Sequence, residues 1–132
     1  MSTTKFLVIV LAAAVAIGFA VGALGGGNDD FNLEYVCTSA MFFRDTLYVE
    51  GYIRNTSSDE YITGIKQGSV DLYDDYGHLM VSANIPASVR NQSIPAGGRI
   101  KFNFNIPSGK SYFTSVHDIN YGVSGEYNYT DY

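Results

Sequence analysis

Three aspartates, Asp71, Asp74 and Asp75, place several carboxylate oxygens within one five-residue stretch. Hard oxygen ligands of this kind suit calcium. The spacing is not that of an EF-hand loop, however, and Asp71 is expected to point outward from its strand. Asp74 begins a turn, where an aspartate commonly accepts hydrogen bonds from turn amides. We therefore favour turn stabilisation for Asp74, and a calcium site built from the three aspartates is the lesser alternative.

The other chemically active residues form no catalytic motif. His78 and His117 are the only histidines, and neither lies in a recognisable motif. The sequence has no nucleophile elbow, and none of its Gly-rich segments is a phosphate loop following a strand. The lone Cys37 has no second cysteine for a disulfide or a zinc site, so we expect it to pack as a small apolar side chain. These observations predict a protein that is not an enzyme, with no cofactor and no small-molecule substrate.

The charge balance narrows the range of partners. The formal net charge is −5, and all thirteen Asp/Glu but only seven of the eight Lys/Arg lie after residue 28. A surface with this excess of acid repels phosphate groups. The sequence therefore argues against nucleic acid and against anionic lipid headgroups as partners.

The segments that position these residues are predicted to be β-strands. Residues 46–54 alternate cleanly, with Leu47, Val49 and Ile53 on one face and polar or tyrosine side chains on the other. This period of two is typical of a strand with one buried face. Residues 99–106 repeat it, and further strands are expected at 33–43, 70–72, 79–83, 88–93 and 115–123. Turn residues separate these segments. The pattern predicts an all-β, Ig-like or fibronectin-like antiparallel β-sandwich.

The N-terminus carries a different signal. Residues 6–24 form an uncharged run of nineteen apolar or small residues. As a helix this run spans roughly 28 Å, close to the hydrocarbon thickness of a bilayer, about 30 Å. We predict an N-terminal hydrophobic helix, either a retained transmembrane anchor or a cleaved signal peptide. Both place the rest of the chain outside the cytoplasm, at the cell membrane or secreted. Small residues recur every four positions and could mediate helix–helix contact: Ala14, Gly18, Gly22 and Gly26.

These features divide the chain into four parts. We expect the anchor or signal helix at 1–24, a Gly-rich linker at 25–30, one β-sandwich at 31–124 and a flexible Tyr-rich tail at 125–132. The domain is large enough to bury a core without disulfides or metals.

Two further sets of residues bear on location and partners. Three sequons place possible glycans at Asn55, Asn91 and Asn128. Exposed tyrosines make good protein contacts, and three are candidates: Tyr48, Tyr52 and Tyr76. If this outer face binds, the partners are proteins or carbohydrates.

Several segments resemble the FxLYD-type extracytoplasmic domains of bacteria and archaea. The stretch 49–56 (Val-Glu-Gly-Tyr-Ile-Arg-Asn-Thr) is similar to one strand of that family, and 70–74 (Val-Asp-Leu-Tyr-Asp) is similar to its naming motif. Residues 94–98 and 102–104 resemble its later segment. The chain departs from the motif at Val70, where the family has Phe. The resemblance spans residues 47–106 and implies a β-sandwich outside the cytoplasm with no enzymatic activity.

Together these observations predict a non-enzymatic envelope protein, membrane-anchored or exported, that displays a small β-sandwich for protein or carbohydrate interaction. A pilin-like filament subunit, with the N-terminal helix in the filament core, is the alternative. The site expected just before the apolar run for pilin processing is missing, because Thr4-Lys5 leads directly into Phe6. A secreted enzyme is the least favoured reading.

Overall fold

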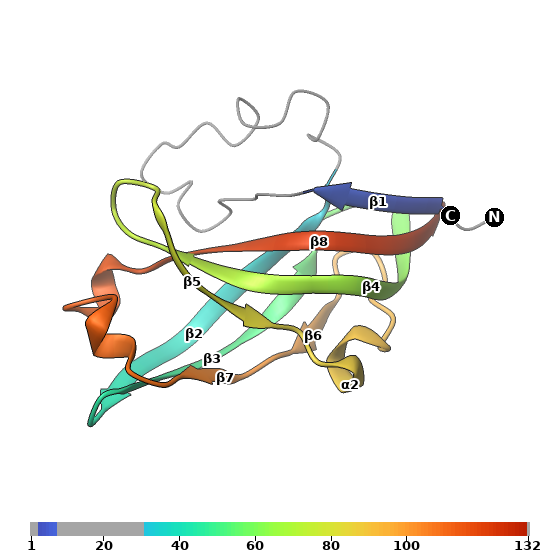
Figure 1. Ribbon diagram of the computed structural model, residues 1–132. Coiled ribbons are helices and arrows are strands. Elements are labelled where there is room, and N and C mark those ends of the chain that lie inside the picture. Colours follow the sequence, from blue (N-terminus) through green and yellow to red (C-terminus); the bar gives the residue numbers. More distant parts are fainter. Residues whose placement is uncertain (1–2, 8–30, 132) are drawn as a thin grey trace.

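The computed structural model describes residues 3–7 and 31–131 (Figure 1). Most of the predicted N-terminal helix, the 25–30 linker and the four small residues Ala14, Gly18, Gly22 and Gly26 lie outside the described residues. Within them, no helix has both the length and the apolar character needed to cross a bilayer.

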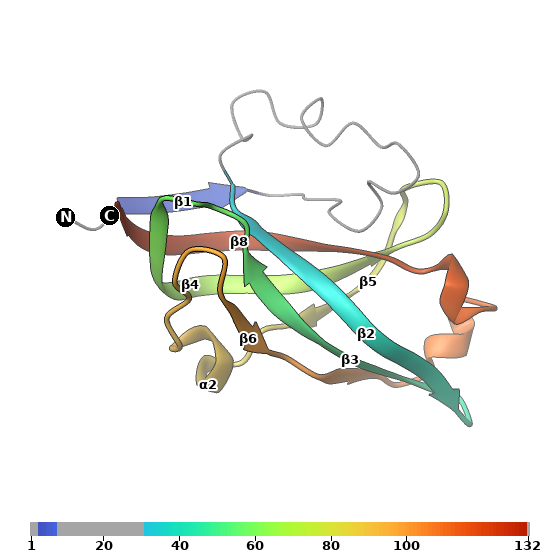
Figure 2. The ribbon, with the colours of Figure 1, turned by 180° about the vertical axis from the view of Figure 1, so that it is seen from behind.

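The described chain is mostly β and forms two antiparallel sheets, as the sequence predicts for a β-sandwich. One sheet has the order β1-β8-β4-β5, with β1 Thr3–Leu7, β8 Asn120–Asp131, β4 Glu60–Tyr73 and β5 Leu79–Asn84. The other has the order β2-β3-β6, with β2 Leu33–Phe43, β3 Thr46–Asn55 and β6 Arg99–Lys101, while β7 Phe104–Ile106 also pairs with β3. Figure 2 shows β2 and β3 from behind, crossing β8 and β4 at an angle.

The core lies between the two sheets. On β3, Leu47, Val49 and Ile53 are buried, which confirms the predicted alternation. The first and last regions of the domain meet in this core, since the hydroxyl of Tyr127 accepts a 2.9 Å hydrogen bond from the backbone N–H of Asn32. The side chains that fill the core come from both sheets and include Tyr35, Ile62, Val70, Leu72, Ile100, Phe102, Ile106, Tyr121, Val123 and Tyr127. Cys37 packs against this cluster, as expected for a small apolar side chain.

The strand predicted over 99–106 is interrupted at residues 102 and 103. The backbone still contacts β3 there, because the N–H of Phe102 donates to the carbonyl of Gly51. The hydroxyl of Tyr35 donates to the carbonyl of Phe102 across 2.7 Å, and burial raises the pKa of this hydroxyl well above its ordinary value. A side chain from β2 therefore replaces one strand-to-strand contact at the interruption.

Within residues 31–131, three short helical turns connect the strands. They are α2 Ala87–Arg90, η2 Gly109–Ser111 and η3 Val116–Asp118. The strand predicted at 88–93 is wrong, because residues 88–90 belong to α2 and residues 91–93 form no strand. The strand predicted at 115–123 begins only at Asn120, since the Ser115 hydroxyl accepts from the N–H of His117 and starts a helical turn instead.

The C-terminal segment also differs from the prediction. Residues 125–131 belong to β8 and not to a flexible tail, so the folded unit continues past residue 124. They pair with β4 on one side and, through residues 125–129, with β1 on the other. The period of two places Val123, Tyr127 and Tyr129 on the face toward the core, and Tyr127 is completely buried. The polar composition of the segment hides this pattern, because the inward-facing residues are mainly tyrosines.

β1 is the second difference at a terminus. Thr3–Leu7 pairs antiparallel with β8, from Thr3 opposite Tyr129 to Leu7 opposite Gly125. Phe6 and Leu7, predicted as the first helical residues of the apolar run, are therefore in a strand. β1 pairs with the backbone groups that β8 would otherwise leave free at its edge. The hydrophobic pattern of the N-terminal residues alone does not predict this pairing.

Candidate binding surface

The three aspartates do not come together as one cluster. Asp71 lies on the outer face of β4, and its Oδ1 accepts hydrogen bonds from the hydroxyls of Ser69 and Ser82, each at 2.7 Å. Asp74 and Asp75 follow in the β4–β5 connection. Across residues 31–131, no three His, Cys, Asp or Glu side chains come together in a way that could hold a metal ion.

Asp74 stabilises the β4–β5 turn, as predicted. Its Oδ1 accepts from the backbone N–H groups of Tyr76 and His78, both at 2.9 Å, and Oδ2 lies 3.1 Å from Nδ1 of His78. The N–H of His78, followed by that of Tyr76 and the imidazole, holds the pKa of the Asp74 carboxyl below its ordinary value. Hydrogen bonds to the charged form have this effect because they favour ionisation.

The three sequons occupy very different positions. Asn91 is exposed just after α2, and Asn128 is half-buried within β8. Asn55 is completely buried, and its Nδ2 donates to the carbonyls of Glu60 at 2.8 Å and Ile94 at 3.0 Å. A glycan attaches to that nitrogen, so the proposal of a glycan on Asn55 is incompatible with the folded domain. Through these hydrogen bonds Asn55 instead connects the end of β3 to Glu60 and to Ile94.

The candidate tyrosines separate into two groups. Tyr48 and Tyr52 both lie on the outer face of β3, and Tyr76 is in the β4–β5 connection with 81% of its surface exposed. The outer face of β3 also contains Glu50 and Arg54, which alternate with the buried residues. Two of the three predicted contact tyrosines, Tyr48 and Tyr52, therefore lie together on the outer face of the β2-β3-β6 sheet.

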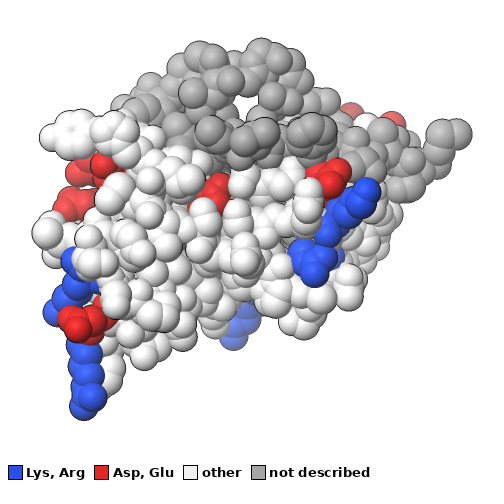
Figure 3. Space-filling model, in the orientation of Figure 1, with Lys and Arg blue, Asp and Glu red and all other residues white. Residues whose placement is uncertain are grey.

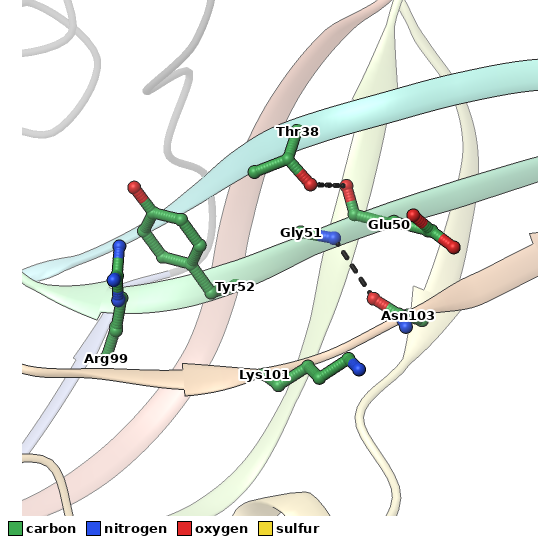
Figure 4. Close-up of a pocket in the computed structure, with 7 residues that line it drawn as sticks. All are labelled: Thr38, Glu50, Gly51, Tyr52, Arg99, Lys101 and Asn103. Carbon is green, nitrogen blue, oxygen red and sulfur yellow. Dashed lines mark hydrogen bonds between the residues drawn. The ribbon is translucent and has the colours of Figure 1, made fainter.

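An open depression lies on that face and has a volume of about 420 Å³ (Figure 4). Small-molecule sites typically measure roughly 300–1,000 Å³. We call it the cationic depression; its lining residues are Thr38, Glu50, Gly51, Tyr52, Arg99, Lys101 and Asn103. They come from three neighbouring strands and from the interruption between β6 and β7.

Irregularities in two strands create the depression. A β-bulge between Cys37 and Ser39 adds Thr38 to the edge strand β2, and the Thr38 hydroxyl donates to the carbonyl of Glu50 at 3.1 Å. On the other side, Oδ1 of Asn103 accepts from the backbone N–H of Gly51 at 3.1 Å. Figure 4 shows Asn103 directed at Gly51. Side chains thus complete backbone pairing at both irregularities.

Gly51 forms the floor of the depression for a steric reason. A Cβ at this position would lie 2.2 Å from the carbonyl oxygen of Val36 and 2.7 Å from the hydroxyl oxygen of Tyr35. Neither distance is possible for real atoms, so the close approach of β2 to β3 requires glycine.

The cations around the depression are crowded. Arg99 is directly opposite Arg54 in the pairing of β6 with β3, and Lys101 is opposite Tyr52. Arg54 forms a 2.8 Å ion pair with Glu34, and the guanidinium of Arg99 lies 4.6 Å from the centre of the Tyr52 ring. Among the described residues, no carboxylate forms an ion pair with Arg99 or Lys101. The sequence did not predict that these cations lie together, since β6 and β3 are far apart in the chain. The alternation of residues 99–101 was the only sequence feature that indicated their outward orientation.

Beyond the depression the same face becomes apolar. Met41, Phe43 and Tyr48, here called the apolar end, are 53%, 55% and 41% exposed. Met41 is opposite Tyr48 in the pairing of β2 with β3, so their side chains are neighbours. Exposed apolar side chains that lie together commonly mark interaction sites.

The face drawn in Figure 3 shows no large basic surface. In the orientation of Figure 1, Lys and Arg side chains lie in small separate groups toward the margins of the molecule (Figure 3).

Comparisons with known proteins identify no relative. No family model, curated protein or solved structure matches this chain.

Proposed function

We propose that this chain is a non-enzymatic envelope protein, membrane-anchored or exported, whose Ig-like or fibronectin-like sandwich binds a partner through the outer face of the β2-β3-β6 sheet. The observation that carries the proposal is the apolar end beside the cationic depression. Met41, Phe43 and Tyr48 are large apolar or aromatic side chains that lie exposed on the adjacent strands β2 and β3. Aromatic residues and methionine are enriched at protein interfaces, and tyrosine is among the residues that contribute most to binding there.

The location in the envelope rests on the sequence. The apolar run at 6–24 and the resemblance to FxLYD-type domains both support export. A glycan on Asn91, which is exposed just after α2, is compatible with the fold, and a glycan on Asn128 stays a prediction.

Site-specific photocrosslinking tests the binding face. A photoreactive phenylalanine analogue replaces Tyr48 in the full chain, and a matched chain carries it in place of Asn84, which is exposed on β5 of the other sheet. After illumination of intact cells that make the protein naturally, we expect a discrete adduct at position 48 and none at position 84. Equal adducts at both positions, or none at either, would contradict the proposal. The mass of the adduct distinguishes a protein from a saccharide.

A filament subunit is the alternative. The intact mass of the protein in membrane fractions and in sheared surface fractions separates the two. Chains that retain residues 6–24 in the membrane fraction support an anchored module, whereas the same mass in sheared filaments supports the alternative. A mass that begins near Leu24 indicates a secreted domain.

A further inference from the structure

We infer that the cationic depression binds a saccharide that carries carboxylate groups, such as a chain of uronic acids. This inference rests on the proposed binding role and names the ligand class of one part of the face. Four features support it. They are side-chain donors without partners, neighbouring like charges, a carboxylate acceptor beside an aromatic ring, and backbone groups that are already hydrogen-bonded.

Among the residues that the structure describes, the depression contains side-chain donors without a protein partner. Arg99 and Lys101 are two residues apart on β6, so their side chains project from the same face. Neither forms an ion pair within the described part of the chain. Asn103 uses only Oδ1 in its bond with Gly51, which leaves its amide NH₂ group available. A carboxylate accepts up to four hydrogen bonds and suits the planar fork of an arginine.

The arrangement of cations also favours an anion. Arg54 and Arg99 face each other across two strands, where like charges destabilise a sheet. Glu34 neutralises Arg54 but is not paired with Arg99 or Lys101. A bound carboxylate would offset this repulsion at Arg99 and Lys101.

The acceptors and the aromatic ring favour a saccharide over an acidic peptide. The carboxylate of Glu50 lines the depression and forms no ion pair within the described residues. It can accept hydrogen bonds from sugar hydroxyls, which a run of acidic side chains does not offer. Tyr52 adds an aromatic surface beside these polar groups, and Figure 4 shows Arg99 next to its ring.

The backbone gives a further reason to exclude a peptide. Extended peptides usually bind by pairing with free backbone groups at a sheet edge. Here the N–H of Gly51 is taken by Asn103, the carbonyl of Glu50 by Thr38 and the carbonyl of Phe102 by Tyr35. A ligand in the depression itself is therefore recognised mainly by side chains, as a saccharide is.

Calorimetric titration of the full chain in detergent micelles tests the inference. The probes are trigalacturonate, neutral galactotriose, the peptide triglutamate and inorganic sulfate. We expect trigalacturonate to bind at least tenfold more tightly than the other three, with a dissociation constant that rises as salt is added. Equal binding of triglutamate would identify an acidic peptide site, and equal binding of sulfate would indicate non-specific attraction of ions. Either result, or no binding of trigalacturonate, would overturn the inference.

Two substitutions localise the site. Arg99→Gln should weaken the binding of trigalacturonate at least tenfold, and Arg99→Lys should weaken it less, because it keeps the charge but not the planar fork. Arg44→Gln is the matched control, since Arg44 also lies over an aromatic ring, that of Phe43, but outside the depression. Equal losses of affinity for trigalacturonate in Arg99→Gln and Arg44→Gln would show that it binds outside the depression. Thermal unfolding of each variant verifies that it is folded.

The two proposals fail in different ways. If trigalacturonate does not bind but the adduct at position 48 still forms, the binding role stands and the ligand class is wrong. If the adduct is also absent, the face is not a binding surface.

Discussion

The outer faces of the two sheets use polar residues differently. On the β8-β4-β5 side, the serines bond to other side chains: Ser69 and Ser82 donate to Asp71, and Ser69 lies 3.2 Å from Ser124. On the β2-β3-β6 side, Arg99 and Lys101 form no ion pair with any described residue, and the face continues into the exposed apolar end. In both sheets, outward-facing residues alternate with core residues along the strands, so this alternation alone does not distinguish the two faces.

The difference shows which polar residues serve the fold. Polar side chains that satisfy one another contribute to folding and leave little capacity for a ligand. Cations left without carboxylate partners on an acidic protein contribute little to stability and retain their capacity to bind. The β2-β3-β6 face is therefore the better candidate for function.

The largest expected effect comes from the core beneath the binding face. Phe102→Ala should lower the free energy of unfolding by about 3–5 kcal/mol, because the ring is buried and its removal leaves a cavity. Urea denaturation measures this. Phe43→Ala, at the exposed apolar end, should change stability by less than about 0.5 kcal/mol. Similar values for the two variants would mean that the core and the outer face have been assigned wrongly.

A second pair of substitutions compares the two outer faces directly. Ser82→Ala should cost about 1.5 kcal/mol, because it removes a hydrogen bond to the buried carboxylate of Asp71. Lys101→Ala should cost less than about 0.5 kcal/mol, since Lys101 has no ion-pair partner in the described residues. Thermal unfolding of both variants gives the comparison. A larger loss for Lys101→Ala would show that the cation is structural.

Asn103 tests whether the irregular strand holds the binding face in shape. Asn103→Ala should cost about 1 kcal/mol, because the backbone N–H of Gly51 loses its acceptor. Amide hydrogen exchange should become faster at Gly51 and remain unchanged in the β4–β8 pairing. Unchanged protection at Gly51 would indicate that this hydrogen bond contributes nothing.

The smallest effect is an acid dependence confined to the β8-β4-β5 side. The pKa of Asp74 is lower in the folded state than in the unfolded chain, whose value is about 3.9. Its contribution to stability is therefore complete above about pH 4 and is lost as the pH falls through the folded pKa. Asp74→Asn should reduce the dependence of the melting temperature on pH below pH 4. An identical dependence in wild type and variant would show that other carboxylates account for it.

Local patterns were sufficient for much of the fold. The period of two in residues 46–54 identified β3 and its buried face, and Asp74 was correctly assigned to its turn. The sequence failed where a segment depends on distant partners. Residues 125–131 appear polar but pair with β4, and residues 125–129 also pair with β1. Asn55, a sequon by pattern, is completely buried and donates hydrogen bonds to the carbonyls of Glu60 and Ile94.

The sequence by itself determined the all-β class, the positions of most strands and the outward orientation of Tyr48 and Tyr52, because alternation is a local property of the chain. Only the tertiary structure decided that Arg54, Arg99 and Lys101 gather on one face, since β3 and β6 are joined through a pairing between distant segments. It also decided that Asp71 is satisfied by Ser69 and Ser82 while Lys101 is left without an ion pair in the described chain. Which polar groups have partners is a property of packing, and that property distinguishes the two faces.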